Sequence, residues 1–378
     1  MILQQKTIGI NTLFLIPGKV GGTEIFLRKQ IEELSKIKTN NQYLIYCNEE
    51  NKNTFGKLPK NFVLKNTGVY ATNRLLRVFW EQVVFPFVLL RDHVDLLHSP
   101  GYTTPIFTNC KKITTIFDLN YYFYPEDFSV IERLVYSVLI PVGASTSDRI
   151  IVHSNKSKDE MCKILKVKKD KVDVIYGGVP DEFKKKILYE KAVRVISKFG
   201  IKQPYILANS TSHPHKNLKS LVLAFVKLAE DKSFKDNLVL IGIHGKAHNE
   251  LDQIIKLNNL VDRVQFTGWI DYNNIVYFNR LADVFVVPSL YEGFGLPIVE
   301  AMACGVPLIA SKYSCIPEIV GKGGLVIDVK KPYLIAKKIN ELLKSKIKRD
   351  RLSKLGKERA SLFSWKDFGR KIYNLYNA

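Results

Sequence analysis

The sequence lacks the cysteine pattern of a disulfide-rich or zinc-binding protein. Its five cysteines, Cys47, Cys110, Cys162, Cys304 and Cys315, are scattered along the chain, and no two of them form a C-x-x-C pair. This spacing disfavours a disulfide scaffold and a structural zinc site. Scattered single thiols instead predict a protein of the reducing cytosol.

Long apolar runs are missing as well. The stretch from Ile8 to Ile16 is interrupted by Gly9, Asn11 and Thr12, which does not fit a secretory signal peptide. No run approaches the roughly 20 apolar residues that a membrane-spanning helix needs. We therefore expect a cytoplasmic protein, and we expect any membrane contact to be peripheral, on the inner face of the plasma membrane.

Acidic residues are few relative to basic ones. The 378 residues contain 36 Asp and Glu against 57 Lys and Arg, a formal charge of +21. Such an excess predicts anionic partners, among them phosphorylated substrates and an acidic membrane surface. A lysine-rich composition of the whole chain explains the charge equally well. Nucleic acid is not an expected partner, because the lysines after Tyr333 have no aromatic residues among them before Phe363 and Trp365.

Familiar nucleotide and metal motifs are also absent. No D-x-D stands at the end of an expected strand, and no carboxylate cluster indicates a Mg²⁺ site. The first glycine loop, residues 17–24, matches neither G-x-G-x-x-G nor a P-loop. We therefore expect no metal and no cofactor, and we expect any leaving phosphate to be neutralised by amides and cations.

The most informative stretch runs from Pro288 to Pro307 and reads P-S-L-Y-E-G-F-G-L-P-I-V-E-A-M-A-C-G-V-P. The β-branched and aromatic run just before it, residues 284–287, predicts a strand. Gly293 and Gly295 allow a sharp turn, and Pro297 suits the first turn of a helix. Strand, glycine loop and helix place the amides of residues 294–296 at a helix N-terminus, which is a natural site for a phosphate.

Two acids, Glu292 and Glu300, flank this turn. If the helix begins at Phe294, Glu300 lies about 9–10 Å along its axis. That geometry does not fit an acid/base pair facing one bond, which needs carboxyl groups about 5–9.5 Å apart. The two acids fit better as hydrogen-bond acceptors at the two ends of a long ligand such as a nucleotide sugar. The alternative is a helix cap and a surface glutamate.

Strands and helices alternate in both halves of the chain. A strand over Thr7–Ile16, the glycine loop and a helix over Ile25–Ser35 open the first half, and the same order restarts at Tyr205. This pattern predicts an α/β protein with two Rossmann-like domains and a ligand cleft between them. The break at residues 176–180 sets the predicted boundary, with domains at 1–178 and 179–360.

Polar groups follow two strands of the first half. His98 and Asp118 come at strand ends, where open α/β sheets face a ligand. We expect His98 to be structural and Asp118 to face a substrate wall formed by residues 119–122. The amides of Gly21 and Gly22 either contact an anion or only make a tight turn. Residues 75–90 predict a helix kinked near Pro86, either a core helix or one that lies against lipid.

The stretch E-G-F-G-L-P-I-V-E resembles the E-x7-E signature of retaining glycosyltransferases with the GT-B fold, especially glycosyltransferase family four. The resemblance covers nearly the whole chain, and residues 80–82 with Pro86, followed by residues 98–100, are most similar to mannosyltransferases of surface-polysaccharide assembly. It extends to five further stretches: residues 21–24, 215–217, 266–269, 305–307 and 317–318. The closing residues 361–378 resemble the family's last helix, which crosses back to the first domain.

The resemblance implies transfer of a hexose, mannose first, from a nucleotide diphosphate sugar to a hydroxyl of a lipid-linked or surface glycan. It implies that Glu300 binds the ribose, Glu292 the donor sugar and Lys216 the diphosphate, and that Asp118 lies near the acceptor. The expected catalytic residues are Asp118, Glu292 and Lys216. The expected donor-binding residues are Gly21, Gly22, His213, Lys216, Gly268, Trp269, Ile270, Glu292, Gly293, Phe294, Gly295, Leu296 and Glu300.

Two positions depart from the family pattern. Phe117 stands where many members have histidine, and His213 where many have arginine. These departures keep two alternatives open, a nucleotide-sugar 2-epimerase of the same fold and a catalytically weak sugar-nucleotide binding protein. The donor base, the sugar, the acceptor, the linkage and the oligomeric state are also left open by the residues.

Overall fold

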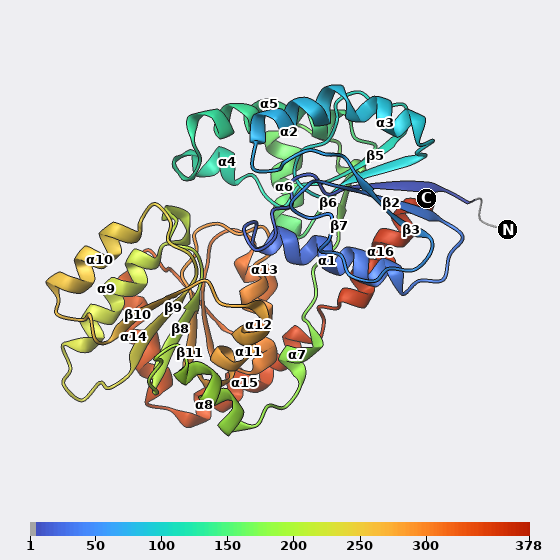
Figure 1. The fold of residues 1–378 in the computed structure, drawn as a ribbon. Helices are drawn as coiled ribbons and strands as arrows, with labels where there is room; N and C mark the ends of the chain where they lie inside the picture. The colour runs from blue at the N-terminus through green and yellow to red at the C-terminus, as the bar shows by residue number, and fades with distance from the viewer. Residues whose placement is uncertain (1–4) are drawn as a thin grey trace. The chain divides into compact units, whose positions relative to one another are not determined.

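The computed structural model describes residues 5–378, and the chain divides into two compact units (Figure 1). Unit 1 consists of Met1–Phe123, Phe128–Gly177 and Trp365–Ala378, and unit 2 consists of Tyr124–Asp127 and Gly178–Ser364. Each unit is an α/β layer structure around one sheet, and each sheet is parallel throughout. The predicted class, two Rossmann-like domains with parallel sheets, is confirmed.

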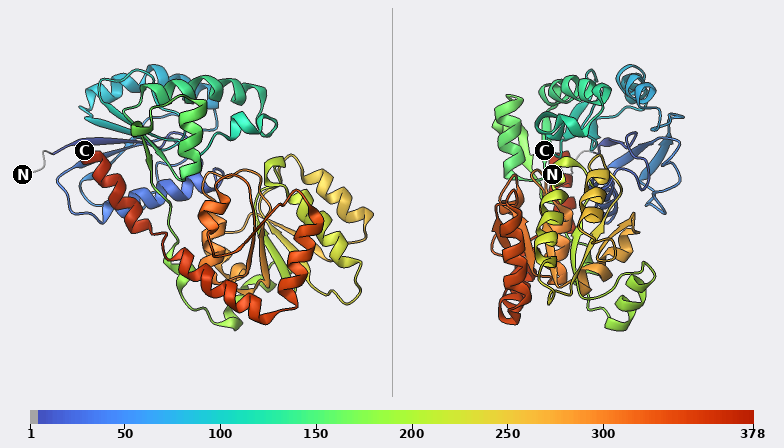
Figure 2. Two further views of the ribbon diagram at one scale, coloured as in Figure 1. Left: turned by 180° about the vertical axis from the view of Figure 1, so that it is seen from behind. Right: turned by 90° about the vertical axis from the view of Figure 1, so that its left-hand side faces the viewer.

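Unit 1 contains a seven-stranded sheet in the order β3-β2-β1-β4-β5-β6-β7. Helices α2, α3 and α5 cover one face of the sheet, and α1 and α16 cover the other (Figures 1 and 2). The strands are β1 (Thr7–Asn11), β2 (Gln42–Cys47), β3 (Phe62–Asn66), β4 (Leu96–Ser99), β5 (Lys111–Thr115), β6 (Arg149–Val152) and β7 (Val172–Val174). The helices are α1 (Gly22–Ser35), α2 (Arg74–Val83), α3 (Phe85–Arg91), α4 (Asn120–Phe123), α5 (Val130–Thr146), α6 (Asn155–Ile164) and α16 (Trp365–Asn377).

Unit 2 contains a six-stranded sheet in the order β10-β9-β8-β11-β12-β13. Its core joins the sheet to the apolar faces of α9, α10 and α14, as the buried side chains of Leu221, Leu251 and Ile339 show. The strands are β8 (Tyr205–Asn209), β9 (Asn237–Ile241), β10 (Val264–Gly268), β11 (Val284–Val287), β12 (Leu308–Ser311) and β13 (Leu325–Ile327). The helices are α7 (Asp181–Lys184), α8 (Tyr189–Ser197), α9 (Leu218–Ala229), α10 (His248–Leu257), α11 (Tyr272–Leu281), α12 (Leu296–Cys304), α13 (Ile316–Val320), α14 (Pro332–Leu343) and α15 (Lys346–Ala360).

The first strand is shorter than the apolar pattern predicts. It ends at Asn11, although Leu13 and Leu15 are fully buried. The side-chain oxygen of Asn11 accepts the N–H of Leu13 at 3.1 Å, and the Thr12 hydroxyl donates to the carbonyl of Tyr46 at 2.8 Å. These local side-chain bonds compete with the ladder, so the chain turns while its apolar residues remain in the core.

The kink predicted near Pro86 appears as a break between two helices. Helix α2 ends at Val83 and α3 begins at Phe85, with the proline in its first turn. A proline has no N–H to continue the α2 ladder, whereas it costs nothing at the start of a new helix.

The last helix, α16, belongs to unit 1 and packs on α1. Gly369 makes this approach close, because a Cβ atom there would lie 2.4 Å from the Cβ of Glu33. Trp365 and Phe368 contact the ring of Phe26 edge to face, with centroids 5.1 and 5.7 Å away. The C-terminal residues thereby complete the fold of unit 1. Within residues 5–378, no helix combines the length and the apolar character needed to span a bilayer.

Candidate donor site in unit 2

The turn from β11 to α12 shapes the candidate site. Gly295 precedes the helix with φ +87°, and a Cβ atom there would lie 2.6 Å from Cδ1 of Ile298, so only glycine fits without strain. Pro297 lies in the first turn, and Gly305 ends the helix with φ +78°. The helix begins at Leu296, two residues later than we assumed. Glu300 therefore lies only about 6 Å along its axis, at 1.5 Å per residue.

Lys216 and Glu292 form an ion pair in this site. Lys216 Nζ donates to Glu292 Oε1 at 2.8 Å, and the two side chains are only 19% and 17% exposed. Burial alone would raise the pKa of Glu292, but the charge and the hydrogen bond of Lys216 together lower it. Glu292 is therefore ionised at neutral pH, and the side chain of Lys216 is held beside it in the turn that leads into α12.

The loop that carries Lys216 is fixed by hydrogen bonds to the ends of neighbouring strands. Asn217, in the left-handed conformation at φ +53°, donates from its side chain to the carbonyls of Pro288 and Val329 at 3.1 and 3.2 Å. The amide of Leu290 donates to the carbonyl of His215 at 2.8 Å. These bonds connect the loop after β8 to the loop after β11, so Lys216 and Glu292 are held together by backbone as well as by charge.

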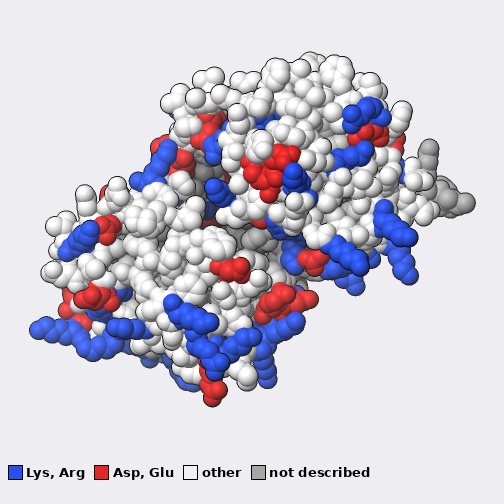
Figure 3. All heavy atoms as spheres, in the orientation of Figure 1, with Lys and Arg blue, Asp and Glu red and all other residues white. Residues whose placement is uncertain are grey.

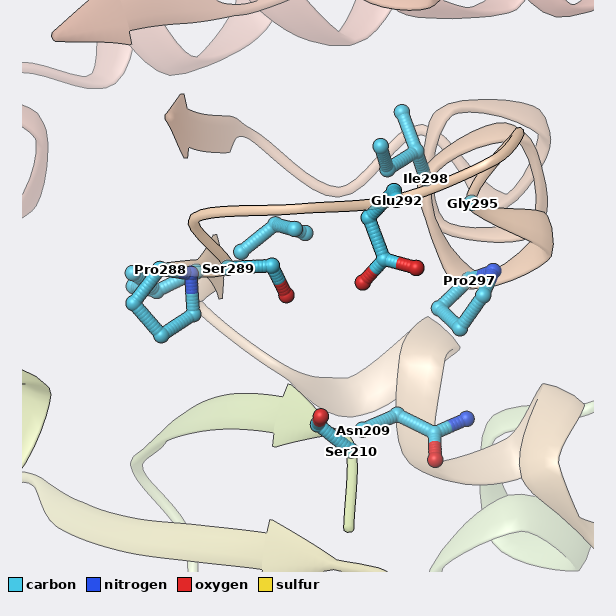
Figure 4. Close-up of a pocket in the computed structure, with 10 residues that line it drawn as sticks. Asn209, Ser210, Pro288, Ser289, Glu292, Gly295, Pro297 and Ile298 are labelled. Carbon is cyan, nitrogen blue, oxygen red and sulfur yellow. The ribbon is translucent and has the colours of Figure 1, made fainter. Parts of the chain in front are cut away.

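The backbone of Glu292 is held from the other side by the loop after β12. Its N–H donates to the Ser314 hydroxyl at 3.2 Å, and its carbonyl accepts from that same hydroxyl at 2.8 Å. The thiol of Cys315 donates to the carbonyl as well, at 3.0 Å. Figure 4 shows the carboxylate of Glu292 directed toward Asn209 and Ser210. These two residues, Glu292 and Gly295 are among those that line a cavity of about 10 Å³. Such a volume holds one water molecule, so it is a packing gap beside the site rather than a ligand pocket.

Glu300 has a different environment from Glu292. It is 1% exposed, and its carboxylate accepts a hydrogen bond from the hydroxyl of Tyr272, the first residue of α11, at 2.5 Å. Burial raises the pKa of Glu300 to about 7, and the Tyr272 hydrogen bond only partly opposes this. Tyr272 is not among the predicted site residues. Its position at a helix start, three residues after Trp269, was the only available signal.

The predicted base-binding turn follows β10. Gly268 has φ +69°, which a residue with a side chain rarely adopts, and its carbonyl accepts the N–H of Gly242 at 3.1 Å. Trp269 is 60% exposed, whereas Ile270 is buried at 4%. The turn thus presents one large aromatic surface to the exterior and anchors itself through its neighbour.

The other predicted donor residues of unit 2 surround the same strand ends. His213 lies just before the short helical turn Pro214–Lys216, and burial lowers its pKa, so it is neutral at pH 7. The ring of Phe294 is buried against Phe363, with centroids 5.6 Å apart. All the predicted donor residues of unit 2 follow the carboxyl ends of parallel strands: His213 and Lys216 come after β8, Gly268, Trp269 and Ile270 close or follow β10, and Glu292, Gly293, Phe294, Gly295, Leu296 and Glu300 come after β11.

Gly21, Gly22 and Asp118 lie in unit 1. Gly21 precedes α1 with φ +59°, and the carboxylate of Glu24 accepts the N–H of Gly18 at 2.7 Å, which closes the glycine loop. The Asp118 carboxylate accepts the N–H of Asn120 at 3.0 Å.

Residues at two strand ends of unit 1 are buried in its core. The substrate wall predicted beside Asp118 is wrong for Leu119 and Tyr121, which are 0% and 6% exposed and belong to the core. His98 is fully buried between Tyr376 and Thr115, and burial lowers its pKa to about 3. It is a neutral structural residue, as expected.

The site can bind an elongated anionic ligand. It offers a helix N-terminus and a lysine for phosphate, and two carboxylates on either side of the glycine turn for hydroxyl groups. In the part of the chain from residue 5 onward, no three His, Cys, Asp or Glu side chains are grouped so that they could hold a metal ion.

Comparison with known proteins agrees with this geometry. The family "Glycosyl transferases group 1" matches residues 190–359, and "Glycosyltransferase Family 4" matches residues 20–183. A glycosyltransferase of Methanocaldococcus jannaschii is 32% identical over 297 residues, covering 76% of this chain and 77% of that protein. O-antigen chain mannosyltransferase B of Escherichia coli is 28% identical over 290 residues, covering 76% and 75%.

A solved structure, sucrose-phosphate synthase from Thermosynechococcus elongatus, superposes with a TM-score of 0.79 over 98% of both chains. At 20% sequence identity, this similarity supports the fold alone. The family matches and the two relatives support membership of the family. The chain therefore belongs to the family-four-like glycosyltransferases with the GT-B fold, and it is related to mannosyltransferases.

Proposed function

We propose that this glycosyltransferase moves a hexose, with mannose as the first candidate, from a nucleotide diphosphate sugar to a hydroxyl of a lipid-linked or surface glycan. The observation that carries the proposal is the pair of buried acids on either side of the glycine turn, with Lys216 bonded to the first. This arrangement suits a ribose at one end, a hexose at the other and a diphosphate between them. Mannose is favoured because a relative at 28% identity is named an O-antigen chain mannosyltransferase.

The proposed roles follow the local chemistry. Glu300 accepts hydroxyl protons of the ribose, and Glu292 accepts those of the sugar. Lys216 and the amides of Gly295 and Leu296 stabilise the charge that develops on the diphosphate, so no metal is needed for that step. For Gly21, Gly22 and Asp118 of unit 1, a role in binding the donor or the acceptor stays a prediction from the family resemblance.

We propose that the anomeric configuration is retained. The bond between the anomeric carbon and the diphosphate oxygen breaks, and the acceptor oxygen bonds to the same face of that carbon. The acceptor proton passes to the leaving phosphate oxygen, which gives the glycoside and the nucleoside diphosphate. This route is supported by the partners of the two acids, because neither carboxylate is free to act as a nucleophile. Glu292 is bonded to Lys216, and Glu300 is bonded to Tyr272.

We also propose that the protein works at an acidic membrane surface on the cytoplasmic side, in the assembly of a surface polysaccharide such as the O-antigen of lipopolysaccharide. The net charge of +21 supports attraction to anionic lipid.

The test is incubation with labelled GDP-mannose, UDP-glucose and dTDP-rhamnose, each with bacterial glycolipid extract and each with and without EDTA. Transfer of one label to glycolipid, unaffected by EDTA and with the donor's anomeric configuration in NMR spectra, is the expected result. Formation of a free epimer would favour the 2-epimerase. Tight donor binding without turnover in any extract would favour a binding protein.

A further inference from the structure

The outer helices of unit 1 expose large apolar side chains. The most exposed are Leu75 and Phe79 on α2, Phe87 on α3, and Val130, Ile131 and Leu134 on α5, which are 58–79% exposed. The edge of the molecule over α2 and α5 in the space-filling view carries few charged side chains (Figure 3). An apolar patch of this extent on a protein surface marks a binding site for another molecule.

A cavity lies within this surface. It has a volume of about 460 Å³ and is formed by α2 and its preceding turn on one side and by the first turns of α5 on the other. Leu75, Val78, Ile131 and Val135 supply its apolar wall. This volume falls within the range of about 300–1,000 Å³ that small-molecule sites occupy.

One charged side chain of the cavity has a buried nitrogen without a hydrogen-bond partner. Arg77 lines the cavity and is 8% exposed, and its Nε has no hydrogen-bond partner among the residues described. A guanidinium removed from water without a partner is costly. Its planar fork matches a phosphate or carboxylate group in geometry and charge.

The nearby acid does not fill this role. Glu81, one turn further along α2, accepts hydrogen bonds from Asn11 at 2.8 Å and from Thr103 at 3.1 Å. Burial raises the pKa of Glu81, and the charge of Arg77 only partly offsets that effect. At the rim, Arg74 is already paired with Glu132 of α5. The cavity therefore has an ion-paired arginine at its edge and, in its wall, an arginine whose Nε has no hydrogen-bond partner among the residues described.

We propose that this cavity binds one phosphate-bearing lipid, with the phosphate at Arg77 and the hydrocarbon chain against the apolar wall. Two observations select this chemistry. A free phosphate would leave the apolar wall and the exposed side chains around it in water, and a neutral lipid would leave the Nε of Arg77 without a partner. The inference rests on the proposed function in one respect, because a glycan acceptor carried on a phosphorylated lipid is the class of ligand that places such a chain on this enzyme.

The test is calorimetric titration of the full chain with decyl phosphate, with decanol and inorganic phosphate as separate probes. We expect one molecule of decyl phosphate to bind per chain, at least tenfold more tightly than either other probe. Equal affinity for inorganic phosphate overturns the lipid part of the proposal, and equal affinity for decanol overturns the role of Arg77.

Variants localise the binding. R77Q is expected to lower the affinity for decyl phosphate tenfold or more, and R77K by less, since lysine retains the charge but not the fork. Because a change at a buried residue can unfold unit 1, the exposed Ile131→Lys serves as a second probe, with Ile347→Lys in unit 2 as its matched control. Ile347 is 82% exposed. Loss of binding in I131K but not in I347K supports the site, and equal binding in all variants overturns it.

These titrations contain no nucleotide sugar, so they are independent of the transfer assay. If decyl phosphate does not bind while labelled sugar is transferred to glycolipid, the lipid site is wrong and the proposed function stands. If decyl phosphate binds to a chain that binds no nucleotide sugar, the lipid site stands and the proposed function is wrong.

Discussion

The two units share one topology but use their strand ends differently. In unit 2, hydrogen bonds join the loops after β8, β11 and β12: Lys216 donates to Glu292, Asn217 to the carbonyl of Pro288, and the amide of Glu292 to Ser314. In unit 1, the buried polar groups at the strand ends form a neutral network, with His98 bonded to Gln30 and Tyr376.

The contrast shows that the fold alone does not determine the chemistry. Burial lowers the pKa of His98 to about 3, so this strand end of unit 1 holds no charge, whereas unit 2 keeps an ionised Glu292 bonded to Lys216. What unit 1 offers instead is an apolar outer layer on α2, α3 and α5. The predictions below test this division between an ionic site in unit 2 and an apolar surface in unit 1.

The largest expected effect is on diphosphate binding. Lys216→Met should weaken binding of the nucleoside diphosphate product about 100-fold, because a charge-assisted hydrogen bond contributes about 1.5–3 kcal/mol. It should also cost about 2 kcal/mol of stability, since Glu292 is left without its partner in a site that is 17% exposed. Calorimetry and thermal unfolding measure the two effects.

Adding Glu292→Gln to Lys216→Met separates the two effects. The double variant should regain the lost stability, because no buried carboxylate then lacks a partner, but it should not regain affinity. Recovery of affinity in the double variant would show that Lys216 serves only to neutralise Glu292.

The second effect concerns stability against pH. The pKa of Glu300 is raised from 4.5 to about 7, so between these values the folded protein holds a proton that the unfolded chain has lost. The contribution of Glu300 to the free energy of unfolding therefore falls as the pH rises from about 4.5 to about 7. Without ligand, Glu300→Gln should be on the order of 3 kcal/mol more stable than the parent at pH 8, and no different at pH 4.5. Urea unfolding at both pH values measures this, and parallel pH profiles would show that Glu300 is already ionised.

A smaller effect is expected from Tyr272→Phe. Removing the hydroxyl withdraws a hydrogen bond that stabilises the ionised Glu300. Donor affinity, which should increase as Glu300 ionises, should then reach half its maximum about one pH unit higher than in the parent. Titrations between pH 6 and 8.5 measure the midpoint. Tyr277→Phe on the same helix is the control, and an equal shift in both variants would contradict a specific role for Tyr272.

The smallest effect is expected at the outer surface of unit 1. Phe79→Ser should reduce co-sedimentation with vesicles containing phosphatidic acid about threefold and leave donor affinity unchanged, because the side chain is 58% exposed on α2. Leu257→Ser, at an 82% exposed position of unit 2, is the matched control. Equal loss in both variants would mean that the apolar layer of unit 1 has no special role.

Local patterns predicted much of the fold and part of the site. The strand β11, the glycine turn and α12 follow from residues that are neighbours in sequence, so their arrangement was accessible. The bond between Tyr272 and Glu300 was not, because it joins residues 28 positions apart whose approach depends on how α11 packs on α12. The same reason explains why Tyr121 was expected in a substrate wall: its aromatic ring gives no sign in the sequence that it enters the core.

The central claim is that Glu300 and the glycine turn before it bind the nucleotide sugar. The most direct measurement is calorimetric titration of the tightest-binding of GDP-mannose, UDP-glucose and dTDP-rhamnose into the parent, Glu300→Ala and Glu341→Ala. Glu341 is a surface residue of α14 paired with Lys338, so it controls for the loss of one carboxylate. We predict that Glu300→Ala lowers donor affinity at least 50-fold and that Glu341→Ala leaves it unchanged. Equal donor affinity in all three proteins would contradict the assignment of Glu300 to the nucleotide sugar.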